Sequence, residues 1–134
     1  MKILFLDDDQ SRHDIFKRRS IGCKVDHVYS AKQTIDFLSK TDYDLVMLDH
    51  DLGGPESEYQ LLDDNDDGRT VCQWFATQTD NTKFLNTIFI IHSLNPAGNN
   101  AMNNMLRDCG LTSHSLPFAW KTFNYNNKRV NFNG

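Results

Sequence analysis

Acidic and imidazole side chains gather in three short stretches of this sequence, and each stretch directly follows a run of mostly apolar residues. The stretches are residues 7–9 (Asp-Asp-Asp), 49–51 (Asp-His-Asp) and 92–93 (His-Ser). Carboxylates held close together repel one another unless a cation compensates them or their pKa values rise. Carboxylate oxygens suit Mg²⁺, and added imidazole nitrogen moves the preference toward Mn²⁺, Fe²⁺ or Zn²⁺. The candidate ligands of a divalent metal ion are four of these aspartates, Asp7, Asp8, Asp49 and Asp51.

The apolar runs before these stretches have the pattern of strands that are buried on both faces of a parallel sheet. They are Lys2–Leu6, Asp44–Leu48 and Thr87–Ile91, each short and nearly continuous in apolar residues. Two more strands are expected, at Lys24–Tyr29 and Ser115–Ala119.

Helices are expected between these strands. The first covers Ser11–Ser20, with Ser11 as a candidate N-cap. The second begins at Ser30, where Gln33 three residues later completes a possible capping box. A third helix starts near Arg69, and a fourth runs from Pro96 to a C-cap at Gly110. The acidic, glycine-containing stretch Gly53–Gly68 is expected to be a loop and a lid over the site.

The alternation of strands and helices predicts an α/β fold, a single domain built on a doubly wound, parallel, five-stranded sheet in the flavodoxin-like order 2-1-3-4-5. In that order the first strand neighbours the third, and the third neighbours the fourth. The carboxyl ends of parallel strands share one edge, so the three polar stretches should meet there. We assign residues 1–123 to this domain and residues 124–134 to an Asn-rich C-terminal tail.

Composition narrows the classes of function. The net charge of −4 argues against broad nucleic-acid binding, which needs a basic face. The three cysteines lack metal-ligand spacing and are expected to be reduced thiols. The N-terminus becomes acidic too early for a signal peptide, and the apolar runs are too short to span a membrane. We therefore expect a cytoplasmic protein.

The motifs themselves resemble those of a known group of proteins. The chain looks like a response-regulator receiver domain from about Met1 to Phe123. It is more similar still to a receiver-derived family, the cyclic-phosphate-processing receiver-like domain. The segments that carry this similarity are LDD followed by Arg12, LDHDLG, GRTV and HSLNPAG. In receivers an apolar residue follows the phosphoacceptor, whereas this chain has His50 and then a long acidic loop.

The resemblance implies roles for individual residues. By analogy with receivers, Asp7 and Asp8, or Asp8 and Asp9, form an Mg²⁺-binding pair, and Asp49 stands at the phosphoacceptor position. Ser93 and Lys121 match the polar residues that end the fourth and fifth strands. By analogy with the receiver-derived family, the working site comprises Asp8, Arg12, Asp49, His50, Asp51 and His92.

Three functions fit these residues. The first is a metal-dependent phosphoesterase that hydrolyses a cyclic phosphate, either a cyclic nucleotide or a 2′,3′-cyclic phosphate. Its catalytic residues would be Asp49, His50 and His92, and its phosphate-binding residues would be Arg12, Ser93 and Lys121. The second is a receiver switch that is phosphorylated on Asp49. The third is a binding module that sequesters a nucleotide. The expected partner is a small phosphorylated or cyclic nucleotide ligand, although a receiver switch would have no substrate of its own.

Each candidate also has a purely structural explanation. One of the three aspartates at 7–9 is expected simply to cap the first helix. His92 could be a buried histidine bonded to a backbone carbonyl, and Arg12 could pair with Asp8 or Asp9 at the surface. The remaining histidines, His13, His27 and His114, are expected at the surface.

Overall fold

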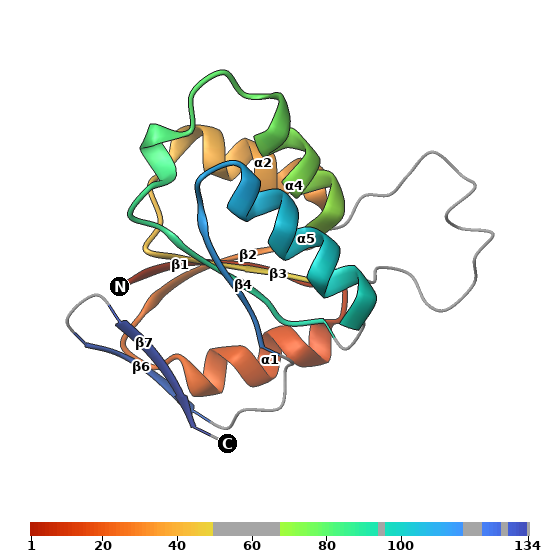
Figure 1. The fold of residues 1–134 in the computed structure, drawn as a ribbon. Coiled ribbons are helices and arrows are strands. Elements are labelled where there is room, and N and C mark those ends of the chain that lie inside the picture. Colours follow the sequence, from red (N-terminus) through yellow and green to blue (C-terminus); the bar gives the residue numbers. More distant parts are fainter. Residues whose placement is uncertain (50–67, 94–95, 117–121, 127–128, 134) are drawn as a thin grey trace.

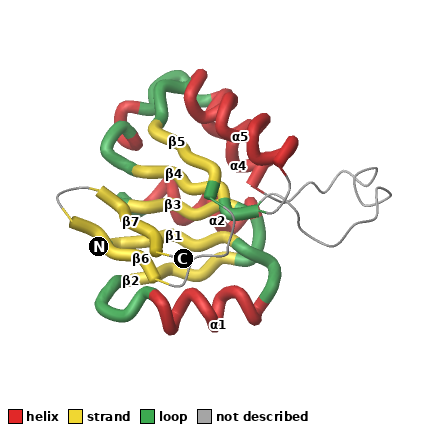
Figure 2. Tube along the Cα trace, turned by 60° about the horizontal axis from the view of Figure 1, so that its bottom comes forward, coloured by secondary structure: helices red, strands yellow, loops and turns green. Residues whose placement is uncertain are grey.

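The sheet has the predicted topology. The computed structural model describes residues 1–49, 68–93, 96–116, 122–126 and 129–133. Five parallel strands lie in the order β2-β1-β3-β4-β5 (Figure 2). Their bounds are β1 Lys2–Leu6, β2 Lys24–Val28, β3 Leu45–Leu48, β4 Ile88–Ile91 and β5 Thr112–Ser115. The prediction of an α/β, doubly wound sheet in the order 2-1-3-4-5 is confirmed.

Helices cover both faces of the sheet. They are α1 Gln10–Arg19, α2 Ala31–Lys40, α4 Gly68–Thr77, the 3-10 turn η1 Thr82–Phe84 and α5 Pro96–Asp108. Helix α1 lies on one face, and α2, α4 and α5 lie on the other (Figure 1). Side chains alternate between the faces of a strand, so Ile3 and Phe5 pack with Phe16 of α1, while Leu4 and Leu6 join the core under the other three helices.

The helix starts show how local chemistry sets the element boundaries. Ser30 caps α2 as predicted, because its side chain accepts a hydrogen bond from the Gln33 N–H, and Gln33 Oε1 in turn accepts from the N–H of Tyr29. The predicted cap of α1 is wrong. Helix α1 begins at Gln10, and Asp9 is its N-cap, accepting hydrogen bonds from both the N–H and the hydroxyl of Ser11. Asp is as good an N-cap as Ser, and its charge also interacts favourably with the helix dipole.

The fifth strand was predicted at the wrong residues. Strand β5 covers Thr112–Ser115, three residues before the predicted start. It lies at the edge of the sheet and buries only Ser113 among its own side chains. An edge strand of four polar residues has no apolar pattern by which to recognise it. The residues that follow it are more apolar and so have the sequence pattern of a strand.

The chain also forms a β-hairpin that the sequence analysis did not predict. Strands β6 (Thr122–Asn126) and β7 (Arg129–Asn133) pair in antiparallel fashion, and this hairpin crosses the predicted boundary between domain and tail (Figure 1). That boundary stays a prediction. Within the described ranges, none of the helices has both the length and the apolar character needed to cross a membrane.

Candidate functional site

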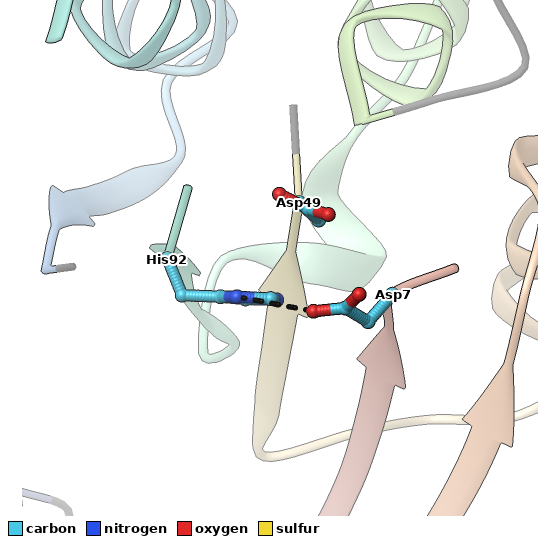
Figure 3. Close-up of side chains that lie close together, drawn as sticks. All are labelled: Asp7, Asp49 and His92. Atoms are coloured by element: carbon cyan, nitrogen blue, oxygen red, sulfur yellow. Dashed lines mark ion pairs between the residues drawn. The ribbon is translucent and has the colours of Figure 1, made fainter. Parts of the chain in front are cut away.

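Asp7, Asp49 and His92 form a buried cluster at the carboxyl edge of the sheet (Figure 3). One potential ligand atom from each of these side chains lies within 4.8 Å of the others. All three residues are at most 3% exposed. Sequence analysis expected the ends of three neighbouring strands to meet, and the structure brings these three residues together.

Strand register explains why these residues meet. Phe5 lies opposite Met47 in the β1–β3 pair, and Leu48 lies opposite Ile91 in the β3–β4 pair. Continuing both registers past the strand ends places Asp7 and His92 on either side of Asp49. The His92 N–H donates to the Leu48 carbonyl at 3.0 Å, which extends the β3–β4 ladder into the site.

The surroundings of His92 fix its charge and its tautomer. Its Nε2–H donates to the backbone carbonyl of Leu6 at 3.0 Å, and its ring stacks on Phe5 with the centroids 5.0 Å apart. Burial is the main cause that lowers the pKa of His92 to about 4, so the ring is neutral at pH 7. The neutral ring then carries its lone pair on Nδ1, which lies 3.7 Å from Oδ2 of Asp7. The bond to a backbone carbonyl is therefore present, but it leaves the second nitrogen directed at a carboxylate.

Arg12 contacts four carboxylates at once. Its Nε and Nη2 donate to the two oxygens of Asp7 at 2.6 and 2.8 Å. Its other contacts are 3.4 Å to Asp49, 3.4 Å to Asp9 and 3.7 Å to Asp8. The hydrogen bond with Asp7 is the main cause that raises the pKa of Arg12. The expected surface pairing with Asp8 or Asp9 is thus secondary to a fork on buried Asp7.

The other two aspartates of the first stretch lie outside the buried cluster. Asp9 caps α1, and the hydrogen bond from the Ser11 hydroxyl is the main cause that lowers its pKa. This confirms that one of the three aspartates is a helix cap. The Asp8 side chain is 35% exposed, and the Asp9 side chain is 42% exposed. Asp7 rather than Asp8 therefore supplies the buried carboxylate at the end of β1.

The remaining predicted site residues divide into two groups. Ser93 is buried at the end of β4, and its carbonyl accepts a hydrogen bond from Nδ2 of Asn99 at 2.8 Å. His50, Asp51, Lys121 and all of the predicted lid before Gly68 lie outside the described residues. Their assigned roles stay predictions.

Gly68 supports the site although sequence analysis gave it no role. Its N–H donates to the backbone carbonyl of Asp49 at 2.8 Å. A Cβ at this position would stand 2.4 Å from that carbonyl oxygen and 2.6 Å from Cε of Met102. Only glycine permits such close packing of α4 on the end of β3. The start of the GRTV segment could have suggested a packed glycine, but its partner could not be identified from sequence.

His13 and His27 were predicted at the surface, and this is wrong for His13 and incomplete for His27. His13 is 0% exposed and His27 is partly buried, whereas His114 is exposed as predicted. Nε2 of His13 donates to the Asp7 carbonyl at 2.8 Å, and its Nδ1 lies 2.6 Å from Nδ1 of His27. Helix periodicity does place His13 on the same side as Phe16, and that was the available clue.

The donor set of the cluster fits a divalent cation. Two ligands that each lie about 2.1 Å from one ion are at most about 4.2 Å apart. The 3.7 Å separation of His92 Nδ1 and Asp7 Oδ2 meets this limit, and a modest closure would bring Asp49 within it. A histidine that donates its far N–H to a backbone carbonyl also has the usual arrangement of a metal ligand. Two carboxylates and one imidazole suit Mn²⁺, Fe²⁺ or Zn²⁺ as well as Mg²⁺.

Comparison with known proteins gives both a family and a fold. A family model described as "Cyclic-phosphate processing Receiver domain" matches residues 2–108. Among solved structures, the CheY4 chemotaxis response regulator of Vibrio cholerae has a TM-score of 0.60 at 13% identity, covering 89% of this chain and 87% of that one. A CheY-like receiver domain from Methylobacillus flagellatus has a TM-score of 0.56 at 19% identity, covering 89% and 86%.

A third similar structure was solved with a bound metal ion. It is the Mn²⁺-bound form of the response regulator Rcp1, with a TM-score of 0.53 at 16% identity, covering 87% of this chain and 79% of that one. At these identities the likeness shows the receiver fold alone. A search of curated proteins finds no match.

Proposed function

This chain belongs to the cyclic-phosphate processing Receiver domain family, and from that premise we propose that it is a metal-dependent phosphoesterase that hydrolyses a cyclic phosphate. The observation that carries the proposal is the position of buried His92 Nδ1, which lies 3.7 Å from Oδ2 of Asp7 in a cluster with Asp49. An imidazole lone pair and a carboxylate are stabilised together when a cation lies between them. The substrate is a cyclic nucleotide or a 2′,3′-cyclic phosphate, and the site of action is the cytoplasm.

In this proposal Asp7, Asp49 and His92 hold the metal, with Asp8 and the undescribed Asp51 as further candidate ligands. Mg²⁺ and Mn²⁺ are the first candidates, and the Mn²⁺-bound Rcp1 structure supports the choice of Mn²⁺ for a test. Such an ion would lower the pKa of a bound water and would neutralise charge on phosphate oxygens. His92 then serves as a ligand, since its other nitrogen is committed to the Leu6 carbonyl.

The chain's own residues supply the rest of the chemistry. In hydrolysis the water oxygen loses a proton and bonds to phosphorus, one ring P–O bond breaks, and the leaving alkoxide takes a proton to give a phosphomonoester. Arg12 is one-third exposed and carries a planar fork that suits a phosphate. His50 is our candidate for the proton donor, because it directly follows Asp49 in the sequence and an imidazole can donate a proton near neutral pH. Ser93 and Lys121 remain candidates for further phosphate contacts.

The test is a cleavage assay on the purified full chain. The protein is stripped with chelator, reloaded with Mn²⁺ or Mg²⁺, and incubated with 2′,3′-cyclic and 3′,5′-cyclic nucleotides. We expect a phosphomonoester product only after metal is restored. Asp49→Asn should lower turnover by at least about a hundredfold, since loss of one carboxylate weakens both the metal site and its charge.

Asp14→Asn is the matched control, because Asp14 is an exposed carboxylate on α1, away from the cluster. Its turnover should equal that of the unmodified protein. If the metal-loaded protein binds a cyclic nucleotide and returns it chemically unchanged, the protein is a sequestering module and the enzyme proposal is wrong.

A receiver switch is the second candidate function, and the position of Asp49 favours it. Asp49 ends β3 in a fold shared with response-regulator receivers, and Ser93 ends the neighbouring β4. Incubation with a small phosphodonor and Mg²⁺ would then label Asp49, as intact mass and the Asp49→Asn variant can establish. Labelling without any cleavage of cyclic phosphates would replace the enzyme proposal with this one.

A further inference from the structure

Arg12 occupies the carboxylates that a metal ion would need. Its Nε donates to Asp7 Oδ2 at 2.6 Å and its Nη2 donates to Oδ1 at 2.8 Å, so both oxygens of that carboxylate are engaged. Oδ2 is also the oxygen that lies 3.7 Å from Nδ1 of His92. The same Nη2 stands 3.4 Å from Oδ2 of Asp49. The guanidinium therefore contacts both of the carboxylates in the candidate metal cluster.

Burial makes this contact energetically favourable in the absence of a metal. The Asp7 side chain is 0% exposed and the Asp49 side chain 4% exposed. Two carboxylates at this depth need a compensating cation, and Arg12 supplies one through a charge-assisted, bidentate pair. A divalent ion between Asp7, Asp49 and His92 would provide that compensation instead. It would also repel a guanidinium a few ångströms away.

Asp8 and Asp9 provide alternative carboxylate partners for Arg12 outside the buried cluster. Asp8 and Asp9 lie 3.7 and 3.4 Å from its terminal nitrogens, and their side chains are 35% and 42% exposed. Arg12 itself is 33% exposed on the first turn of α1. A guanidinium that leaves Asp7 therefore has exposed carboxylates within reach of its present position.

We propose that Arg12 is the resident counter-ion of the metal-free site, that a divalent metal displaces it from Asp7, and that the displaced guanidinium then binds the substrate phosphate. Metal binding consequently precedes phosphate binding, because Arg12 is available for an anion only after it leaves Asp7. This inference rests on the metal site of the proposed function. It concerns the competition between a divalent metal ion and the Arg12 guanidinium for the Asp7 carboxylate. An assay of cleavage activity does not measure that competition.

The test compares Mn²⁺ affinity by titration calorimetry for the full chain and three variants, with no substrate present. Arg12→Gln should bind Mn²⁺ about tenfold more tightly than the unmodified protein, since a charge-assisted pair no longer has to be broken. Arg12→Lys keeps the charge without the fork and should fall between the two. Arg18→Gln removes an equal charge from an exposed position on the same helix and should bind like the unmodified protein.

Thermal unfolding provides the second measurement. Without metal, Arg12→Gln should melt about 4 °C or more below the unmodified protein, because buried Asp7 loses the guanidinium that contacts both of its oxygens. Saturating Mn²⁺ should close most of this gap. If Arg12→Gln is too unstable to purify, Arg12→Lys carries the same comparison with a smaller expected shift.

The outcomes separate this inference from the proposed function. If the unmodified protein binds Mn²⁺ and cleaves a cyclic phosphate, but Arg12→Gln binds Mn²⁺ equally or more weakly, the counter-ion role is wrong and the enzyme proposal stands. If Arg12→Gln binds Mn²⁺ where the unmodified protein barely does, the counter-ion role is supported. If neither protein binds a divalent ion, the metal site of the proposed function is wrong.

Discussion

Two buried histidines flank Phe5 at the end of β1, and they differ in only one respect that matters for function. His92 and His13 are 1% and 0% exposed, and each ring centroid lies 5.0 Å from that of Phe5. Each donates its Nε2–H to a backbone carbonyl, of Leu6 and of Asp7 respectively. Both neutral rings therefore carry the lone pair on Nδ1.

The second nitrogen distinguishes them. Nδ1 of His13 lies 2.6 Å from Nδ1 of His27, which must donate its proton because His13 can only accept there. Nδ1 of His92 faces the Asp7 carboxylate instead. Burial and tautomer alone thus do not create a binding site. An imidazole paired with a second imidazole stabilises the fold, whereas an imidazole directed at carboxylates is ready for a cation.

The largest expected effect that separates the two histidines is on metal affinity. His92→Gln should weaken Mn²⁺ binding by about a thousandfold, since it removes one of three buried ligands. His13→Gln should change the affinity by no more than about tenfold, because its bond reaches only the backbone of Asp7. Titration calorimetry measures both, and exposed His114→Gln is the control. Equal losses in the two variants would contradict the distinction.

The next effect is on folding. His13→Ala should lower the free energy of unfolding by about 3 kcal/mol, because it opens a cavity beside Phe5 and Tyr29 and leaves His27 without its acceptor. Urea unfolding in chelator measures this loss. Saturating Mn²⁺ should then stabilise His13→Ala by as much as it stabilises the unmodified protein. A loss of that metal-dependent gain would mean that His13 belongs to the metal site.

A smaller effect is expected at Gly68, which packs on the carbonyl of Asp49. Gly68→Ala should cost about 1–3 kcal/mol of stability, because its Cβ would displace the end of β3 or Met102. It should also weaken Mn²⁺ binding by moving Asp49. Gly110→Ala is the control: its φ of +81° is strained for alanine, but a Cβ there meets nothing within 4 Å. A normal metal affinity in Gly68→Ala would mean that Asp49 is positioned by other contacts.

The smallest effect concerns pH. Burial is the main cause that lowers the pKa of both His27 and His92 to about 4, below the 6.5 of an unfolded chain. Between pH 6.5 and 4 the unfolded chain therefore binds more protons, and the metal-free protein loses stability as the pH falls through this window. His27→Asn should reduce the proton uptake on unfolding near pH 5 by roughly one proton. If the free energy of unfolding has the same slope against pH in His27→Asn and in the unmodified protein, the lowered pKa of His27 is wrong.

The sequence predicted best those elements in which an apolar run is bounded sharply by polar residues. Strand β1 was predicted at its observed bounds because a buried run ends abruptly in three aspartates. Strand β5 was misplaced because its four residues are polar and its edge position demands little burial. Right-handed crossovers left few strand orders open, and the flavodoxin-like order was the one predicted among them.

The candidate site was predictable to the level of strand ends. Sequence placed the aspartates and His92 at one sheet edge, but it could not assign Asp7 to the buried cluster and Asp9 to the helix cap. Those roles depend on where β1 ends and α1 begins, and three consecutive aspartates do not mark either boundary. The His13–His27 contact joins a helix to a neighbouring strand, and no local pattern encodes such a pair.

The most direct test of the central claim is the anomalous scattering of Mn²⁺ in crystals of the full chain. The account predicts one strong peak about 2.2 Å from a carboxylate oxygen of Asp7, an oxygen of Asp49 and Nδ1 of His92, with Arg12 withdrawn from Asp7. A peak bound only by the exposed carboxylates of Asp8 and Asp9, with Arg12 still on Asp7, would contradict it.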